Sequence, residues 1–151
     1  IDMGVDPFLI APTLIAVIGQ RLVQKLCPGA GKAFPVTDSI QEFLDRQFAD
    51  LPEEYKKKLP AFKEFYHATA TADCPNGVRG RTGVFEIMRM DKKLEQVVLK
   101  EPVEERIFAA ARADGMLTMR EDAIVKALAG EIPFEEINTL GGELFPEEEA
   151  A

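Results

Sequence analysis

Two partial signatures of chemical sites overlap in residues 26–34, LCPGAGKAF. Residues 29–32 suggest a phosphate-binding loop, in which backbone N–H groups wrap a phosphate and a hydroxyl after the lysine holds magnesium. Leu26 stands where such a loop needs its first glycine, and Ala33 stands where it needs the hydroxyl. This spacing argues against phosphate binding by Lys32 and favours a flexible exit from a helix.

Cys27-Pro28 is the second signature, because it can be read as the first half of a zinc knuckle. The only other cysteine of the sequence is Cys74. Two distant cysteines do not make a disulfide framework, and nothing marks the chain as secreted. A cytoplasmic setting is therefore expected.

The overall charge limits the partners of these residues. The 151-residue chain carries a net charge of -8 at pH 7. Nucleic acids and anionic membrane surfaces both require a basic face, so no nucleic-acid partner is expected. A local basic patch around Arg79, Arg81 and Arg89 remains open. The hydrophobic content of 46% is ample for a packed core.

The elements that position the first cysteine are predicted to be helical. Asp6-Pro7 has the residue types of a helix cap and a first helical position, and the apolar residues of 14–26 recur at helical spacing. Residues 8–18 are strongly apolar but too few to span a membrane, which takes about 20 residues. The pattern predicts a buried helix that ends at Cys27.

The middle of the chain predicts a mixture of short elements. Residues 37–66 favour two or three short helices, and residues 68–83 are too rich in Gly, Pro and Asn for regular structure. Residues 84–90 alternate like a half-buried strand. Six aromatic side chains could form a small core of their own: Phe43, Phe48, Tyr55, Phe62, Phe65 and Tyr66.

The rest of the chain is predicted to be helical. Asp91 can cap a helix over residues 92–100, and a second helix from Pro102 should end at Gly115. Thr118 and Glu121 have the spacing of a capping box, so the position of this carboxylate has a helix-end explanation. A last short helix is predicted from Pro133 to Leu140.

Four stretches together resemble the C-terminal part of the hexameric motor ATPases that drive type II secretion and type IV pilus assembly. They are residues 1–10, 20–28, 79–87 and 114–122, in the family's order. The resemblance implies a mainly α fold with a small β element (α+β). This fold would be the helical C-terminal domain of a RecA-like hexameric ATPase with a degenerate zinc-knuckle module inserted.

The resemblance also implies a division of the chain into four parts. These are residues 1–26, the last helical piece of the ATPase core; 27–90, a degenerate cysteine module with a helical insert and one strand or hairpin; 91–140, a C-terminal helical subdomain; and 141–151, an acidic tail expected to be disordered. The sequence has no Walker A loop and no acidic pair after a hydrophobic strand. No catalytic or cofactor-binding residue is therefore assigned, and ATP and magnesium are expected only in the parent motor.

Members of this family commonly hold a structural zinc with two C-x-x-C pairs. Here only Cys27 and Cys74 remain of those pairs, so they are the candidate zinc ligands. A tetrahedral site would have to recruit His67 or Asp73, and neither has the usual spacing. A metal-free module held by packing is favoured over a zinc site.

Four residues receive structural or interface roles. The resemblance implies that Gly80, Arg81 and Gly83 shape a tight turn into the strand, and a turn with solvated arginines is equally open. Arg21, on an otherwise apolar helix, needs an acceptor if it is buried. It either pairs with a carboxylate or lies near a nucleotide phosphate across a subunit boundary.

The leading hypothesis is a non-catalytic C-terminal domain that supports the motor core and transmits ATP-driven movement. Its expected partners are the parent ATPase core, neighbouring subunits of a homohexamer and an inner-membrane platform protein. Its expected location is the cytoplasm, peripheral at the inner membrane. The alternative is a stand-alone adaptor with the same fold and no enzyme activity. A zinc-dependent nucleic-acid-binding module is the weakest hypothesis.

Overall fold

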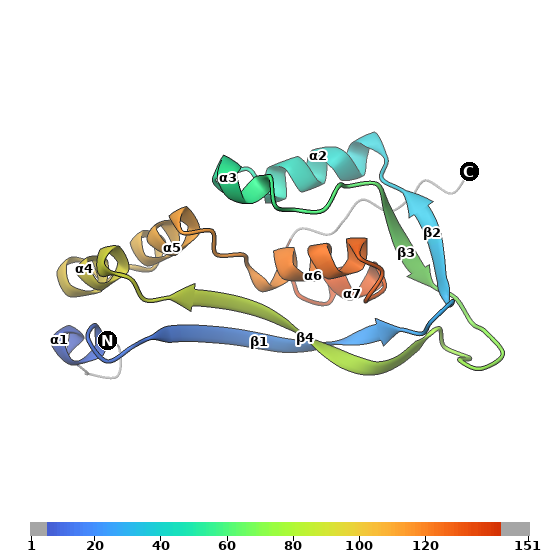
Figure 1. Cartoon of the computed structure of the whole chain (residues 1–151), viewed down its shortest axis with the longest axis horizontal. Coiled ribbons are helices and arrows are strands. Elements are labelled where there is room, and N and C mark those ends of the chain that lie inside the picture. Colours follow the sequence, from blue (N-terminus) through green and yellow to red (C-terminus); the bar gives the residue numbers. More distant parts are fainter. Residues whose placement is uncertain (1–5, 143–151) are drawn as a thin grey trace.

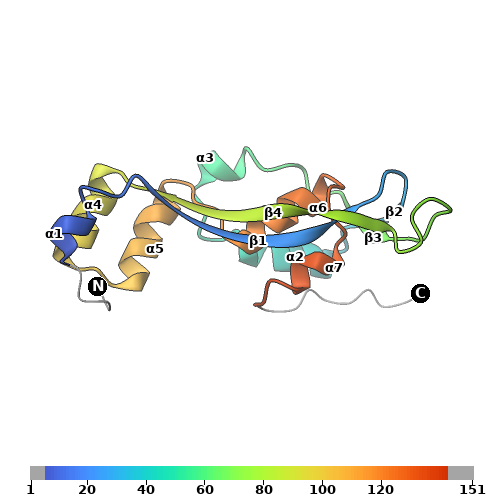
Figure 2. The same ribbon diagram turned by 90° about the horizontal axis from the view of Figure 1, so that it is seen from below.

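A long antiparallel ribbon of two strands runs along the molecule in the computed structural model, which describes residues 6–142 (Figure 1). β1 (Ala16–Leu26) pairs with β4 (Val78–Arg89), beginning with Ala16 opposite Arg89. Figure 2 shows the two strands winding around each other along the ribbon. Such twist is pronounced in ribbons of only two strands.

The predicted helix up to Cys27 is wrong. Only α1 (Pro7–Ile10) is helical in this region, and its N-terminus is capped by the side chain of Asp6, as expected. From residue 16 onward the chain is extended. Its β-branched residues, such as Val17 and Val23, suit a pleated strand, and pairing with β4 outweighs the helical spacing of the apolar residues.

The chain between the two ribbon strands forms a second sheet and two short helices. β2 (Gly31–Pro35) pairs with β3 (Glu64–Ala68). α2 (Asp38–Gln47) and α3 (Glu53–Lys56) connect them. These helices agree with the prediction for residues 37–66, whereas the strand at the end of that segment was not expected.

The strand predicted over residues 84–90 is confirmed but is longer than predicted. It begins at Val78, so part of the predicted irregular segment belongs to β4. The tight turn expected at residues 80–83 is accordingly a stretch of strand.

The helices predicted after Met90 are present. α4 (Lys92–Lys100) and α5 (Glu104–Ala113) lie with α1 at one end of the ribbon. α6 (Met119–Leu128) and α7 (Glu135–Asn138) lie between the ribbon and α2 (Figure 1). The predicted caps are confirmed, because the Asp91 side chain accepts from an N–H of α4, and Thr118 and Glu121 form both bonds of the capping box.

One hydrophobic core joins the chain between the ribbon strands to α6 and α7. Its largest fully buried members come from β1, α2, β3, β4, α6, the loop after α6, and α7: Val23, Ile40, Leu44, Phe65, Val84, Ile124, Ile132 and Ile137. The expectation of a separate aromatic core is therefore only partly right. Phe43, Phe48 and Phe65 are buried, but α6 and α7 complete the core around them.

Side chains of α6 and α7 hydrogen-bond the backbone edges of the ribbon. Asp122 on α6 accepts from the Phe85 N–H of β4 at 2.9 Å. Glu136 accepts from the Gln24 N–H of β1 at 2.9 Å. Edge groups of a strand otherwise lack partners within the sheet. These bonds fix the ribbon to the helices that cover it.

A buried ion pair connects the end of α5 to the start of α6. Arg112 and Glu121 are 4% and 1% exposed, and two hydrogen bonds of 2.7 and 2.6 Å join them. Arg112 also donates to Asp50 at 2.7 Å. Burial alone would lower the pKa of Arg112, but its bonds to Glu121 and Asp50 outweigh burial and raise that pKa. Arg112 therefore remains a cation.

The fold is mixed α and β, in agreement with the predicted α+β class, although its strands are longer than a small β element. Within residues 6–142, no helix combines the length and the apolar character needed to cross a bilayer. The acidic run at 147–149 and the first residues of the 1–10 motif lie outside the described residues.

Candidate functional site

The ribbon carries all four residues that received structural or interface roles. Arg21 lies on β1, and Gly80, Arg81 and Gly83 lie on β4. Gly83 stands opposite Leu22, the neighbour of Arg21. The structure thus brings these residues onto one stretch of the ribbon, although they are distant in sequence.

Arg21 lies on a strand and its side chain is exposed. It therefore does not need the hydrogen-bond acceptor that a buried arginine would require. It stands opposite Val84, on the side of the ribbon that α6 covers. Together with Glu86 and Arg120 it lines a hollow of about 370 Å³. A role for Arg21 at a subunit boundary stays a prediction.

The two glycines of this stretch serve different purposes. Gly80 has φ of +74°, which is in the left-handed region, and a side chain there would meet no atom within 4 Å. At Gly83 a Cβ atom would lie 2.6 Å from the ring of Phe85. Gly80 therefore serves the backbone conformation, and Gly83 makes room for an aromatic ring.

Replacing Gly80 by alanine is expected to lower the free energy of unfolding by about 1 to 2 kcal/mol, because L-residues are disfavoured at this φ. Gly80→Asn should cost less, since asparagine tolerates the left-handed region. Urea unfolding of both variants measures the difference. An alanine variant as stable as the parent would contradict the backbone argument.

The other side of the ribbon is apolar and exposed. Ile18 stands opposite Ile87, and Leu22 lies on the same side further along β1. These three residues, called here the apolar outer face, are 60%, 44% and 58% exposed. The burial predicted for residues 8–18 is therefore wrong for most of that segment. A row of exposed apolar side chains indicates a contact surface for another polypeptide.

A groove between the ribbon and α5 adds apolar surface at the same end of the molecule. It has a volume of about 550 Å³, and its lining includes Val17, Met88 and Phe108. Glu86 and Glu104 are its acidic members. Apolar surface at this end is thus open on more than one side of the ribbon.

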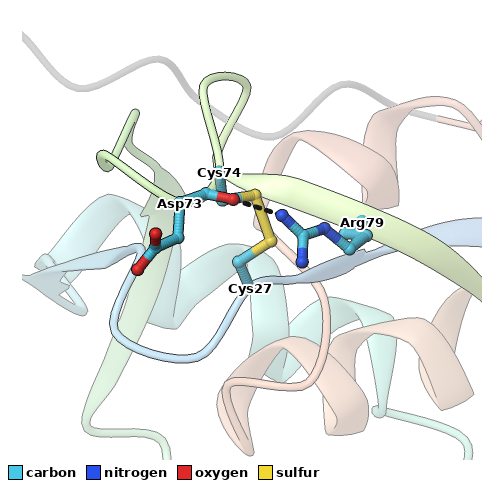
Figure 3. The surroundings of a disulfide bond; sticks show 4 residues. All are labelled: Cys27, Asp73, Cys74 and Arg79. Atoms are coloured by element: carbon cyan, nitrogen blue, oxygen red, sulfur yellow. Dashed lines mark hydrogen bonds between the residues drawn. A yellow bond between two sulfur atoms is a disulfide. The ribbon is translucent and has the colours of Figure 1, made fainter.

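Cys27 and Cys74 form a disulfide bond, with their Cα atoms 6.6 Å apart (Figure 3). The sequence did not predict this bond. The cysteines meet because β1 and β4 leave the ribbon at the same end, where the Cys27 N–H donates to the Gly77 carbonyl at 3.0 Å. The bond therefore links the two ends of the segment inserted between the ribbon strands.

The residues around the cysteines do not fit a zinc site. A disulfide offers no thiolate to a metal. His67 contacts Glu135 through Nδ1 at 2.7 Å and stacks on Phe34, so it is engaged elsewhere. Within residues 6–142, no group of three or more His, Cys, Asp or Glu side chains could hold a metal ion.

The glycine-lysine stretch does not have the geometry of a phosphate loop. Gly29 lies in the turn after Cys27, and Lys32 lies on β2 opposite His67. A phosphate loop leads from a strand into a helix, whereas this stretch leads into a strand. The predicted flexible exit from a helix is also wrong, because the stretch joins β1 to β2.

Sequence reasoning missed several residues that position these features. It gave Glu121 a role only at the helix end, whereas its carboxylate also pairs with Arg112. Asp122 and Glu136 hold the ribbon edges. The capping-box spacing pointed to one bond of Glu121, but no local pattern points to partners that lie on other elements.

Comparison with known proteins agrees with the resemblance carried by the four stretches. The model of the family described as Type II/IV secretion system protein matches residues 1–139. The Type II secretion system ATPase E of Vibrio cholerae is 32% identical over 137 residues, which cover 90% of this chain and 25% of that protein. The Type IV pilus assembly ATPase TfpB of Acinetobacter baylyi is also 32% identical over 137 residues, covering 90% of this chain and 22% of the relative.

A third relative has a similar extent of match. The Type II secretion system protein E of Xanthomonas campestris is 33% identical over 139 residues, which cover 91% of this chain and 23% of the relative. The chain thus spans about a quarter of the length of the curated relatives that it matches. Since the family model covers nearly the whole sequence, the chain belongs to the family of type II/IV secretion system proteins.

Proposed function

We propose that the chain is the C-terminal, non-catalytic domain of a hexameric ATPase that powers type II secretion or type IV pilus assembly. The observation that carries this proposal is the apolar outer face, with Ile18, Leu22 and Ile87 about half exposed. A second polypeptide surface would remove these side chains from water. In this proposal that surface is the nucleotide-binding core of the same motor.

ATP hydrolysis is then the task of the parent's other parts. Two of the three relatives described above are named ATPases, and the chain matches only 25% and 22% of their lengths. The sequence of residues 1–151 contains no phosphate loop. ATP and magnesium would bind in the core, and this domain would respond to the movements of that core.

The four parts expected from the sequence receive distinct tasks in the proposal. Residues 1–26 rest on the core, residues 27–90 form the inserted module, and residues 91–140 carry the C-terminal helices. The acidic residues 141–151 form the tail. Residues 1–26 were expected to form a helical piece of the core, but the surface that they offer is the strand β1.

The ribbon is suited to transmit movement from one end of the domain to the other. It runs from α1 to the inserted module (Figure 1). Asp122 and Glu136 tie its edges to α6 and α7, at 2.9 Å in each case. A displacement of the core at one end would therefore move the helices and the inserted module together.

The partners follow from the same proposal. The domain contacts the parent core and neighbouring subunits of a homohexamer, and the assembled motor acts on an inner-membrane platform protein from the cytoplasmic side. Arg21, Gly80, Arg81 and Gly83 are the proposed structural or interface residues. Their common position on the ribbon supports a contact surface there.

The coding sequence upstream of Ile1 tests the proposal directly. A motor requires a phosphate loop and an acidic box in that upstream sequence. A start codon at this position, with neither motif upstream, would contradict the motor hypothesis and support the stand-alone adaptor. This test does not depend on the folding of any variant.

Charged residues on the apolar outer face are expected to uncouple the domain from the core. The change is Ile18→Glu with Ile87→Lys, made in the complete gene product and in the 151-residue chain; the opposite charges avoid repulsion between these two directly paired positions. In the chain alone, the free energy of unfolding should change by less than about 1 kcal/mol, because both residues are exposed. In the complete product, the rate of ATP turnover should fall at least about tenfold. Phosphate release measures this rate.

The matched control is Gln20→Glu, which adds a charge to the same side of the ribbon without removing apolar surface. It should leave ATP turnover within about twofold of the parent value. Unchanged turnover in the double variant would remove the apolar outer face from the proposal.

A further inference from the structure

We propose that the Cys27–Cys74 disulfide is a site of thiol–disulfide exchange, at which Cys27 forms a mixed disulfide with an anionic low-molecular-weight thiol. The proposal rests on the access to the two sulfurs and on the charges beside them. It goes beyond the motor function and does not depend on it.

Both cysteines are buried, but hollows in the surface lie directly beside them. A hollow of about 530 Å³ is lined by both cysteines, together with Lys25, Asp73 and Arg79. A second hollow of about 450 Å³ is lined by Cys27 and not by Cys74. Cys27 thus borders two hollows and Cys74 one, and Cys27 is the more exposed of the two residues, at 7% against 4%. This makes Cys27 the favoured target.

Cations lie on the approach to the sulfurs, although the chain has a net charge of -8. Lys25 lines both hollows, and Arg79 lines the larger one. The Arg79 guanidinium is held in place by donating to the backbone carbonyl of Asp73, while the Asp73 carboxylate points away from it (Figure 3). In the larger hollow, two cations lie against one carboxylate, which favours an attacking thiol that carries negative charge. The smaller hollow holds one residue of each sign, Lys25 and Glu131, so approach through the larger hollow is favoured.

The exchange follows the ordinary course of such reactions. The thiolate of the small molecule attacks the Cys27 sulfur, a new sulfur–sulfur bond forms, and the bond to Cys74 breaks. Cys74 leaves with the electron pair as a thiolate, whose charge the nearby Arg79 stabilises. A second small thiolate then attacks the small-molecule sulfur of the adduct and releases Cys27. Two small thiols are oxidised to their disulfide, and the protein is reduced to its dithiol.

Exchange at this position would act on the join between the ribbon and the inserted module. The disulfide links residues 27 and 74, whose separation of 47 residues spans β2, α2, α3 and β3. Opening the disulfide removes the covalent link between the two ends of the inserted module. The backbone hydrogen bond from Cys27 to Gly77 remains in place. A disulfide that opens and closes in this way would report on the pool of small thiols around the protein.

The rates of reduction by two thiols test the proposal. The oxidised 151-residue chain is mixed with glutathione, which is anionic, or with 2-mercaptoethanol, which is neutral. Each rate is divided by the rate at which the same thiol reduces an uncharged small disulfide, which corrects for the thiolate fraction and for the nucleophilicity of the thiolate. At low ionic strength glutathione should react at least about threefold faster, and salt should remove the difference. Lys25→Gln with Arg79→Gln should bring the ratio of the two rates to about one.

Two further measurements make the result decisive. Lys32→Gln, a change of an exposed lysine outside both hollows, should leave the ratio unchanged. Acid quenching and peptide mass spectrometry should find glutathione on Cys27 at least about fivefold more often than on Cys74. Equal rates for the two thiols with the unsubstituted chain, or adducts mainly on Cys74, would overturn the proposal.

Discussion

Replacing Arg112 by methionine should lower the free energy of unfolding by about 3 to 5 kcal/mol. The substitution leaves the carboxylate of Glu121 in a site where it is 1% exposed, without the two hydrogen bonds that now join it to the guanidinium. A buried charge without its partner is costly, because neither water nor another cation stabilises it. Urea unfolding followed by circular dichroism measures the loss.

A second substitution separates the buried charge from other effects of losing the arginine. Arg112→Met combined with Glu121→Gln removes both charges, and glutamine can still accept from the Thr118 N–H of the capping box. The double variant should recover at least about half of the loss. Asp50→Asn should cost less than about 1 kcal/mol, because Asp50 is 56% exposed. A loss below about 1 kcal/mol for the single variant would contradict the argument.

Removal of the disulfide should also have a large effect. A cross-link between residues 47 apart lowers the entropy of the unfolded chain, and this contribution to stability is about 4 kcal/mol at 25 °C. Cys27→Ala with Cys74→Ala should lower the free energy of unfolding by about 2 to 4 kcal/mol. Alanine is preferred to serine because both sites are buried and a hydroxyl would need a partner.

Chemical reduction provides the matched comparison. Dithiothreitol should lower the free energy of unfolding of the unsubstituted 151-residue chain by a similar amount. It should leave the double alanine variant unaffected. If dithiothreitol does not change the urea midpoint of the parent, the cross-link does not contribute to its stability. This comparison is independent of any small distortion caused by the alanines.

The parts of the fold that could be predicted are those decided within a few residues. Asp91 caps α4, and Thr118 with Glu121 caps α6, because each cap depends only on a side chain and the backbone three positions away. The residues before Cys27 show the opposite case. Their apolar residues do recur at helical spacing, but the backbone hydrogen bonds that make them a strand come from β4. Because β4 lies far along the chain, no local pattern reveals this pairing.

The candidate site was only partly accessible from the sequence for the same reason. Gly80 and Gly83 were identified through the resemblance, although their positions inside a strand were not. The bond between Cys27 and Cys74 depends on two strands leaving the ribbon together, which no spacing within either segment reveals. The pair of Arg112 with Glu121 likewise joins two helices across a turn.

The shared hydrophobic core has a consequence for synthesis on the ribosome. Phe65 and the other core residues of the inserted module emerge before Ile124 and Ile137, which complete their packing. Translation proceeds from the N-terminus, so the nascent module must wait, with apolar side chains uncovered, until the last helices have been made. Slow elongation through the codons for residues 91–140 would therefore lengthen the period in which chaperones can bind this protein.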